Sequence, residues 1–299
     1  MTKKMDTVTY GVFKNVFNRK LFQDDKAQLL KKVARYPDRY IGLFRPTKPK
    51  IKLIQNLTQS HEIRFGDAFE EVLKLYFERM GYTNLPTRLK YHNNSSDKDE
   101  DLYVDQIFSN RGRIWFIEQK VRDDHDSTKK RGQISNFERK LEVLIKEYGE
   151  SICGIFYFID PSLQKNKNYY WEELGKLSKD YGVELKLFYG KELFTQLGCE
   201  NIWDEILSHL RKWKKELPDF PEINFDLDAV ATFNEIKDLS TAVYRKLFDN
   251  NEIYQEIVLT LFPEGKTLRM LWHYFEEKSS EQTIYKSLKK SLDKRIRLT

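Results

Sequence analysis

The sequence predicts an α/β fold with a central mixed β-sheet, because long amphipathic stretches alternate along the chain with short apolar ones. Residues 60–80 repeat apolar side chains at helical spacing and are followed by Gly81, a helix stop. Residues 152–159 form an uninterrupted apolar run, which is typical of a strand buried on both faces. A hydrophobic content of 40% supports a folded globular chain.

The expected elements follow the order helix, strands, helix, strand. They are helix 10–36, an extended connector at 45–50, helix 60–80, a short strand at 87–92, a polar surface loop at 93–100, a strand hairpin at 101–121, helix 127–148, strand 152–159, helix 169–181, strand 184–189 and helix 203–216. Ser127 or Thr128 is expected to cap the helix at 127–148. After a proline-containing break at 217–221, residues 230–299 are predicted to be mostly helical. The predicted organisation is a helical segment at 1–55, a core at 56–216 and a mostly helical region at 217–299.

Residues 105–120 are predicted to form two apolar strands joined by a turn, yet they carry three charged side chains where a buried hairpin should be apolar. A two-residue loop at 111–112 places Asp105 opposite Glu118 on one face, with Cβ atoms roughly 5 Å apart. Lys120 lies on the same face because strand side chains alternate. Two carboxylates this close repel each other unless a cation lies between them. The pattern therefore predicts a divalent metal site with a lysine beside it, which is an enzyme site.

The motif Asp-x12-Glu-Gln-Lys at residues 105–120, which ends an apolar strand, resembles the PD-(D/E)XK nucleases. Residues 122–133 are similar to the segment that follows the Glu-Gln-Lys motif in certain type II restriction endonucleases. Val104 stands where the family name has proline, a position that is often not proline in the family. The resemblance covers about residues 60–160. It implies a restriction-endonuclease-like core with a central mixed β-sheet flanked by helices, to which helical N- and C-terminal extensions are added.

Asp105 and Glu118 are the expected metal ligands, and the family implies a further oxygen from the carbonyl of Gln119. Hard oxygen donors without a Cys/His set favour Mg²⁺. Lys120 is expected to orient or help deprotonate the attacking water and to stabilise the pentacovalent transition state. The alternative is a set of solvated charges at an exposed hairpin end. The strand at 114–117 is apolar on both faces, which indicates a central strand and favours the functional interpretation.

Two acidic positions leave alternatives open. Asp101 is a second candidate for the first aspartate, but it is expected to lie further from Glu118 than Asp105 does, and a one-residue slip in the turn would reopen the choice. The family often adds an acid from the helix before the sheet. Glu70 lies about 100° and Glu71 about 160° from the centre of the apolar stripe of that helix, so we prefer Glu70 as a catalytic residue. The alternative is that both are ordinary surface glutamates.

Cationic and hydroxyl side chains follow the site and suit phosphate contacts on either side of a scissile bond. The expected DNA-binding residues are Arg122, Ser127, Thr128, Lys129, Lys130, Arg131 and Gln133. A solvated basic loop is the alternative. The formal net charge of +6 suits a nucleic-acid partner but does not require one.

These observations predict a Mg²⁺-dependent type II restriction endonuclease that cuts double-stranded DNA at a short specific sequence, leaves 5′-phosphate ends and acts as a homodimer. A DNA-repair or junction-resolving nuclease on the same scaffold and a non-catalytic DNA-binding protein are the alternatives. The two cysteines, Cys153 and Cys199, match neither a disulfide framework nor a zinc site. Because the N-terminus has no apolar signal region and no apolar run approaches roughly 18 residues, we expect a cytoplasmic protein that does not enter a membrane.

Overall fold

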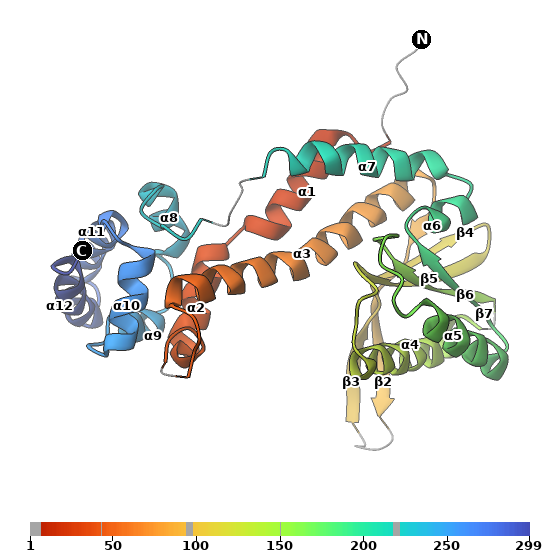
Figure 1. The fold of residues 1–299 in the computed structure, drawn as a ribbon, viewed down its shortest axis with the longest axis horizontal. Coiled ribbons are helices and arrows are strands. Elements are labelled where there is room, and N and C mark those ends of the chain that lie inside the picture. Colours follow the sequence, from red (N-terminus) through yellow and green to blue (C-terminus); the bar gives the residue numbers. More distant parts are fainter. Residues whose placement is uncertain (1–6, 43, 94–97, 150, 218–221) are drawn as a thin grey trace, which may run out of the picture. The chain divides into compact units, whose positions relative to one another are not determined.

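The computed structural model describes residues 7–42, 44–93, 98–149, 151–217 and 222–299 (Figure 1). The chain divides into two compact units. The first, which we call the sheet unit, consists of Met1–Lys20 and Phe65–Leu217. The second, which we call the helical unit, consists of Leu21–Arg64 and Pro218–Thr299. The domain boundaries predicted from the sequence stay a prediction.

A five-stranded mixed sheet, with the strand order β1-β4-β5-β6-β7, forms the centre of the sheet unit. The strands are β1 (Thr83–Asn84), β4 (Gln106–Asn110), β5 (Arg113–Lys120), β6 (Ile152–Phe158) and β7 (Glu184–Tyr189). β4 is antiparallel to β1 and β5, whereas β5, β6 and β7 are parallel. β5 is therefore the central strand, and every residue of β6 is buried, as the apolar runs of both strands predict. The predicted mixed sheet is confirmed.

A tight turn at residues 111–112 joins β4 to β5. Both residues have positive φ angles, +51° and +78°, which is the conformation that a two-residue hairpin turn of this kind requires. The resulting register pairs Gln106 with Ile117, so that Asp105, one position earlier, falls beside Glu118. The predicted two-residue loop is confirmed.

Helices cover both faces of the sheet (Figure 1). They are α1 (Tyr10–Phe22), α3 (Pro49–Arg79), α4 (Ser127–Tyr148), α5 (Lys167–Tyr181), α6 (Lys191–Gln196) and α7 (Glu200–Lys214), of which α1 and α3 continue into the helical unit. On one face, Phe77 of α3 stacks on Phe108 of β4 with ring centroids 4.3 Å apart. On the other face, Phe137 of α4 stacks on Phe116 of β5 at 4.9 Å. This second layer brings α4 over the carboxyl end of β5.

A separate two-stranded sheet precedes β4. It consists of β2 (Arg88–Asn93) and β3 (Lys98–Tyr103), and residues 94–97 between them lie outside the described part of the chain. The loop predicted at 93–100 is wrong for residue 93, which ends β2, and for residues 98–100, which belong to β3. β3 is composed mostly of polar residues, so it lacks the apolar alternation that predicts a strand.

Two helix boundaries differ from the predicted ones. The helix expected at 10–36 is interrupted at Asp24, which has a φ of +58°, and continues as α2 (Asp25–Arg35). The helix expected at 60–80 begins eleven residues earlier, as α3 at Pro49, so the connector expected at 45–50 also ends earlier. A proline is well tolerated at the first helical position, where its missing N–H would have no partner within the helix.

The helical unit has its own apolar core. It contains α2, the short helix η1 (Pro37–Arg39), the start of α3, α8 (Ala229–Ile236), α9 (Thr241–Leu247), α10 (Glu252–Leu261), α11 (Lys266–Lys278) and α12 (Ile284–Ile296). Val33 and Leu53 from the N-terminal part share this core with Ile257 and Phe275 from the C-terminal part. The helical C-terminal region is confirmed, although most of the break predicted at 217–221 lies outside the described residues. Within the described ranges, no helix has the length and apolarity needed to cross a membrane.

Gly154 offers a test of the packing in the central sheet. A Cβ atom at this position would lie 2.6 Å from Cε1 of Phe116 and 2.6 Å from Cδ2 of Leu185. We expect Gly154→Ala to lower the free energy of unfolding by about 1–3 kcal/mol, because the fully buried Phe116 has no room to move. The matched control is Gly175→Ala at an exposed position of α5, where a Cβ meets nothing within 4 Å. This substitution should raise the free energy of unfolding by about 0.5–1 kcal/mol. Urea denaturation measures both, and equal effects would contradict this account of the packing.

Candidate active site

The last three residues of β5 form the centre of the candidate site. Glu118 and Lys120 point to the face that α4 covers, because they alternate with Gln119 along the strand. The side chain of Gln119 faces the other way, and its Nε2 donates a hydrogen bond to the carbonyl of Gly66 in α3 at 3.3 Å. Gln119 therefore presents its backbone, and not its side chain, to the site.

Asp105, which immediately precedes β4, reaches the same point. Its Oδ2 accepts a hydrogen bond from the backbone N–H of Gln119 at 2.6 Å. The side chain is 16% exposed, whereas that of Glu118 is only 4% exposed. A short bond from a backbone amide to a carboxylate fixes the orientation of Asp105 against β5.

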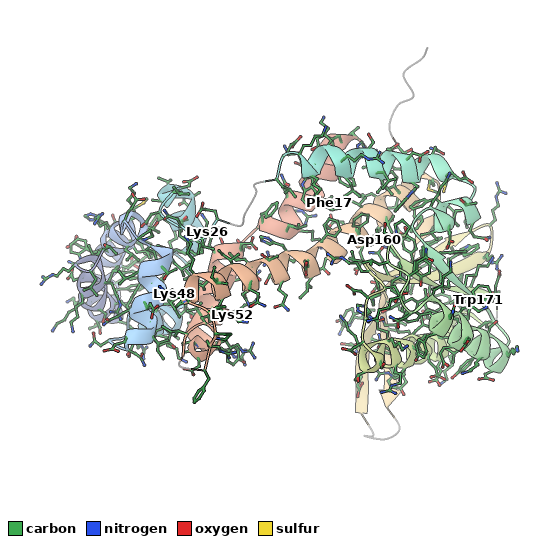
Figure 2. All side chains as sticks on the ribbon, in the orientation of Figure 1. Phe17, Lys26, Lys48, Lys52, Asp160 and Trp171 are labelled. Carbon is green, nitrogen blue, oxygen red and sulfur yellow. The ribbon has the colours of Figure 1, made fainter. Side chains whose placement is uncertain are left out.

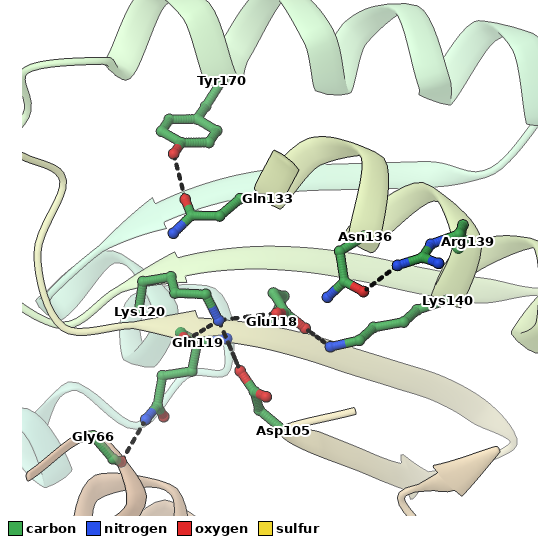
Figure 3. Close-up of polar contacts among 10 residues, drawn as sticks. All are labelled: Gly66, Asp105, Glu118, Gln119, Lys120, Gln133, Asn136, Arg139, Lys140 and Tyr170. Carbon is green, nitrogen blue, oxygen red and sulfur yellow. Dashed lines mark hydrogen bonds and ion pairs between the residues drawn. The ribbon is translucent and has the colours of Figure 1, made fainter. Parts of the chain in front are cut away.

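The ammonium group of Lys120 lies between three oxygens (Figure 3). Its Nζ is 2.9 Å from Oε1 of Glu118, 2.8 Å from the carbonyl oxygen of Gln119 and 3.4 Å from Oδ2 of Asp105. These are the three residues that the sequence nominates as metal ligands, and their oxygens converge on one cation. Oxygen donors of this kind suit Mg²⁺. The donor set therefore fits a divalent ion, provided that the ammonium group moves aside.

The third oxygen of this set is a backbone carbonyl. Across the residues that the structure describes, no group of three or more His, Cys, Asp or Glu side chains could hold a metal ion. A metal at this position would therefore depend on the conformation of the β5 backbone as well as on two carboxylates.

Lys140 of α4 is a member of the site that is not among the residues predicted from the sequence. Its Nζ lies 2.6 Å from Oε2 of Glu118, and the two side chains are 5% and 4% exposed (Figure 3). Lys140 follows Phe137 by three residues and precedes Leu144 by four, so it lies on the apolar stripe of its helix. A lysine on an inward stripe is the sequence signal that could have revealed it.

Glu70 of α3 lies near the carboxylate cluster. It lines a groove of about 420 Å³ together with Asp105 and Asp67. Burial, with the negative charges of Asp105 and Asp67, raises the pKa of Glu70 to about 8. Glu71 lines the same groove but pairs with Lys20 of α1, with Oε2 and Nζ 3.3 Å apart. The structure thus brings Glu70, more than Glu71, under the electrostatic influence of the cluster.

The charges of the cluster shift one another's protonation. Burial and the nearby Glu118 raise the pKa of Asp105, although the two lysines oppose this. Burial lowers the pKa of Lys120, but Glu118 and Asp105 outweigh it and raise the pKa above its ordinary value. In the absence of a metal, the cluster therefore favours a positively charged lysine beside its acids.

Asp101 lies apart from this cluster. It belongs to β3, where it pairs with Lys90 of β2 at 2.8 Å. Hydrogen bonds from Arg88 and Lys90 lower the pKa of Asp101 to about 2. The structure places Asp105, and not Asp101, beside Glu118.

The first turn of α4 carries several of the predicted DNA-binding residues. Its N-cap is Asp126, whose Oδ1 accepts a hydrogen bond from the backbone N–H of Lys129 at 2.8 Å. The predicted capping by Ser127 or Thr128 is therefore wrong, because a carboxylate one residue earlier satisfies the free helix N–H group. Ser127, Thr128 and Lys129 are all exposed.

Two of the predicted DNA-binding residues contact tyrosines of α5. Nζ of Lys130 lies 4.3 Å from the ring centroid of Tyr169. Oε1 of Gln133 accepts a hydrogen bond from the hydroxyl of Tyr170 at 2.6 Å. The remaining two, Arg122 and Arg131, are exposed. DNA binding by these residues stays a prediction.

Asp123 anchors the loop that links β5 to α4, a role that the sequence does not predict. It is fully buried, and its Oδ2 accepts hydrogen bonds from the backbone N–H of Asn166 at 2.8 Å and from the hydroxyl of Tyr189 at 2.9 Å. In the sequence it is one of several acids in a polar run, so nothing distinguishes it there. The anchor holds the start of α4 close to the end of β5.

Residues 84–214 match the family model of the type II restriction endonuclease HinfI. This part of the chain therefore carries a HinfI-type restriction endonuclease domain. A HinfI domain indicates site-specific cleavage of double-stranded DNA, and restriction endonucleases typically use a divalent metal. The predicted PD-(D/E)XK restriction-endonuclease fold is therefore confirmed. No curated protein gives a significant match. The HinfI match contains Asp105, Glu118 and Lys120 but does not extend to Glu70 or to the helical unit.

The raised pKa of Glu70 predicts a pH-dependent stability. An unfolded glutamate ionises near pH 4.5 and the folded Glu70 near pH 8, so the fold binds the extra proton and loses stability as pH rises between these values. We expect Glu70→Gln to be more stable than the wild type at pH 9 in EDTA and equally stable at pH 4. The control Glu71→Gln removes a surface ion pair and should not stabilise at pH 9. Thermal melts measure this, and a benefit of Glu70→Gln that persists at pH 4 would contradict it.

The buried pair of Lys140 and Glu118 predicts strong coupling. Lys140→Met should lower the free energy of unfolding by about 3–5 kcal/mol, because it leaves a buried carboxylate with one partner fewer. Adding Glu118→Leu should restore much of this loss, as measured by urea denaturation in EDTA. Lys146→Met, on the exposed side of the same helix, should change stability by less than about 0.5 kcal/mol. Simple additivity of the two single substitutions would show that the pair is not coupled.

Proposed function

We propose that this chain is a Mg²⁺-dependent type II restriction endonuclease that hydrolyses phosphodiester bonds at a short specific sequence and leaves 5′-phosphate ends. The observation that carries the proposal is the convergence of Asp105, Glu118 and the Gln119 carbonyl on one cation, inside the HinfI-matched region. A site that already gathers three oxygens around one positive charge needs little rearrangement to bind a metal ion.

Asp105, Glu118 and the carbonyl of Gln119 would hold the ion. When bound, Mg²⁺ supplies a water of lowered pKa and neutralises charge on the phosphate. The chain fixes these ligands in advance: the Gln119 N–H holds Asp105, and Lys140 holds one oxygen of Glu118 so that the other points into the site. Such supporting contacts orient ligands and limit the reorganisation that binding requires.

Lys120 would have a different role with Mg²⁺ bound at these three oxygens. Its ammonium group remains tethered at the end of β5, where it can donate hydrogen bonds to the attacking water and to a phosphate oxygen that gains charge in the transition state. Glu70 adds a further carboxyl group next to Asp105, and we propose that it completes the catalytic set.

Phosphate contacts are proposed for the exposed first turn of α4. Backbone N–H groups at a helix start, together with nearby cations, bind phosphate well. Helix-start N–H groups come from Ser127, Thr128 and Lys129, and Lys129 also carries a positive charge. Further positive charge comes from Arg122 and Arg131. Lys130 and Gln133 already contact α5, so phosphate contacts by these two residues have weaker support than those of the exposed residues. A homodimer is proposed because cleavage of both strands at a two-fold site suits two copies of one active site.

Digestion of plasmid and phage DNA with Mg²⁺ tests the proposal. Discrete fragments, with mapped 5′-phosphate ends that share one sequence, are the expected result. Cleavage of branched substrates alone would instead identify a junction-resolving nuclease. Sequence-specific binding without cleavage in any divalent metal would identify a non-catalytic DNA-binding protein.

Lys120→Ala separates the two roles of the lysine. We expect DNA cleavage to fall by about 10²–10⁴-fold, because a positioned acid–base group is lost. Mg²⁺ affinity, measured by calorimetry without DNA, should rise, because the competing ammonium group is gone. Lys179→Ala, which removes an exposed cation of α5, is the matched control and should change neither quantity. Unchanged cleavage by Lys120→Ala or by Asp105→Ala would contradict the site assignment.

A further inference from the structure

The helical unit contains a short segment with an unusual excess of positive charge. Between residues 31 and 50 there are seven cations and a single acid, Asp38. The cations are Lys31, Lys32, Arg35, Arg39, Arg45, Lys48 and Lys50. Their excess of six equals the net charge of the whole chain, so the remaining residues are neutral in sum. All seven side chains are exposed. We call these seven residues the basic end of the helical unit.

Local contacts hold the three arginines of the basic end to the segment of chain at residues 36–38. The guanidinium groups of Arg35 and Arg39 both lie over the ring of Tyr36, at 5.0 Å and 4.5 Å from its centroid. Nε of Arg45 donates a hydrogen bond to the carbonyl of Asp38 in η1 at 3.2 Å. Three residues further along, Lys48 precedes the first turn of α3 (Figure 2). The end of α2, η1 and the start of α3 therefore present their cations within one short stretch of chain.

In the part of the chain that the structure describes, four of these cations contact uncharged groups. Nζ of Lys32 donates a hydrogen bond to the hydroxyl of Ser60 at 2.9 Å, and the two arginines of the stack share a neutral ring. The contact of Arg45 is to a backbone carbonyl. Cations whose contacts are neutral keep their full charge for a partner. A polyanion is the partner that recovers the most free energy from such a cluster, through the release of its condensed counterions.

An exposed aromatic side chain lies within the same segment. Phe44, next to Arg45, is 95% exposed, and Tyr36 is 39% exposed between its two arginines. Of the large apolar side chains that the structure describes as exposed, Phe44 has the highest exposed fraction. Aromatic rings and stacked guanidinium groups in a segment with six more cations than acids suit nucleic acid, which offers phosphates together with apolar base and sugar surfaces.

We propose that the basic end binds the phosphate backbone of duplex DNA and so gives the enzyme a DNA contact on the helical unit, in addition to the residues of the sheet unit. The inference rests on the proposed function for its choice of polyanion. Phosphate contacts are independent of sequence, so the basic end contributes affinity and salt dependence and leaves the recognition of bases to other residues.

The test is a charge-neutralised full-length variant that carries Lys31→Gln, Lys48→Gln and Lys50→Gln. Fluorescence anisotropy with a 30-base-pair duplex of arbitrary sequence, in EDTA, gives the dissociation constant between 50 and 200 mM salt. We expect weaker binding, and a plot of log affinity against log salt that is less steep by roughly 0.9 for every phosphate that the variant no longer neutralises. Thermal melts check that the variant keeps its fold, which exposed substitutions should not disturb.

The matched control neutralises three exposed lysines elsewhere in the same unit, with Lys246→Gln, Lys286→Gln and Lys290→Gln. This control has the same net charge as the first triple variant. It should keep the wild-type affinity for the duplex and the wild-type slope of log affinity against log salt. Equal behaviour of the two triple variants would overturn the inference, because the effect would then depend on net charge and not on position.

Two further outcomes separate this inference from other accounts. Because the titration needs no cleavage, it gives its result even if Mg²⁺-dependent cutting is never found. If cutting is found, the single-turnover rate at saturating enzyme should be unchanged by the Lys31→Gln, Lys48→Gln and Lys50→Gln substitutions. If these substitutions leave duplex affinity unchanged but release the protein from phosphatidylserine vesicles, the inference is wrong and the basic end binds membranes.

Discussion

The Glu118 carboxylate, which is buried between two lysine ammonium groups, is the interaction on which the geometry of the site depends. Taking one ion out of water costs several kcal/mol, so a buried carboxylate persists only where cations and hydrogen bonds compensate for the loss. Lys120 provides one cation from the same strand, and Lys140 provides the other from α4. The stacking of Phe137 on Phe116 holds α4 where its lysine can reach β5. The core of the sheet unit and the charges of the site thus constrain each other.

The hairpin was predictable because its geometry is local. Turn length fixes the register of two paired strands, and side-chain alternation then fixes the faces, so Asp105, Glu118 and Lys120 could be brought together by counting. Lys140 depends instead on which stripe of α4 meets the sheet and at what height, which residue spacing within one helix does not specify. Asp123 has the same difficulty, because its partners Asn166 and Tyr189 are distant in sequence.

The composition of the helical unit shows a second limit of sequence reasoning. Tyr254 of α10 donates a hydrogen bond to the carbonyl of Ala34 in α2, and the two helices share one core although some 220 residues separate them. Helical periodicity identifies each apolar stripe but does not identify its partner. Composition, by contrast, does reveal the basic segment at 31–50. Its interpretation as a binding surface depends on the structure, which shows that its cationic side chains are exposed.

The length of the two-residue turn at 111–112 limits which mutations the site can tolerate. Side chains of a strand alternate, so a single inserted or deleted residue in this turn that shifted the pairing by one position would move Asp105, just before β4, away from the face that carries Glu118. Substitutions at the turn alter only its conformational energy, whereas a change of length would separate the two carboxylates while leaving every residue of the motif in place. We therefore regard the length of this turn as part of the Asp-x12-Glu-Gln-Lys motif, as strictly specified as the identity of its acids.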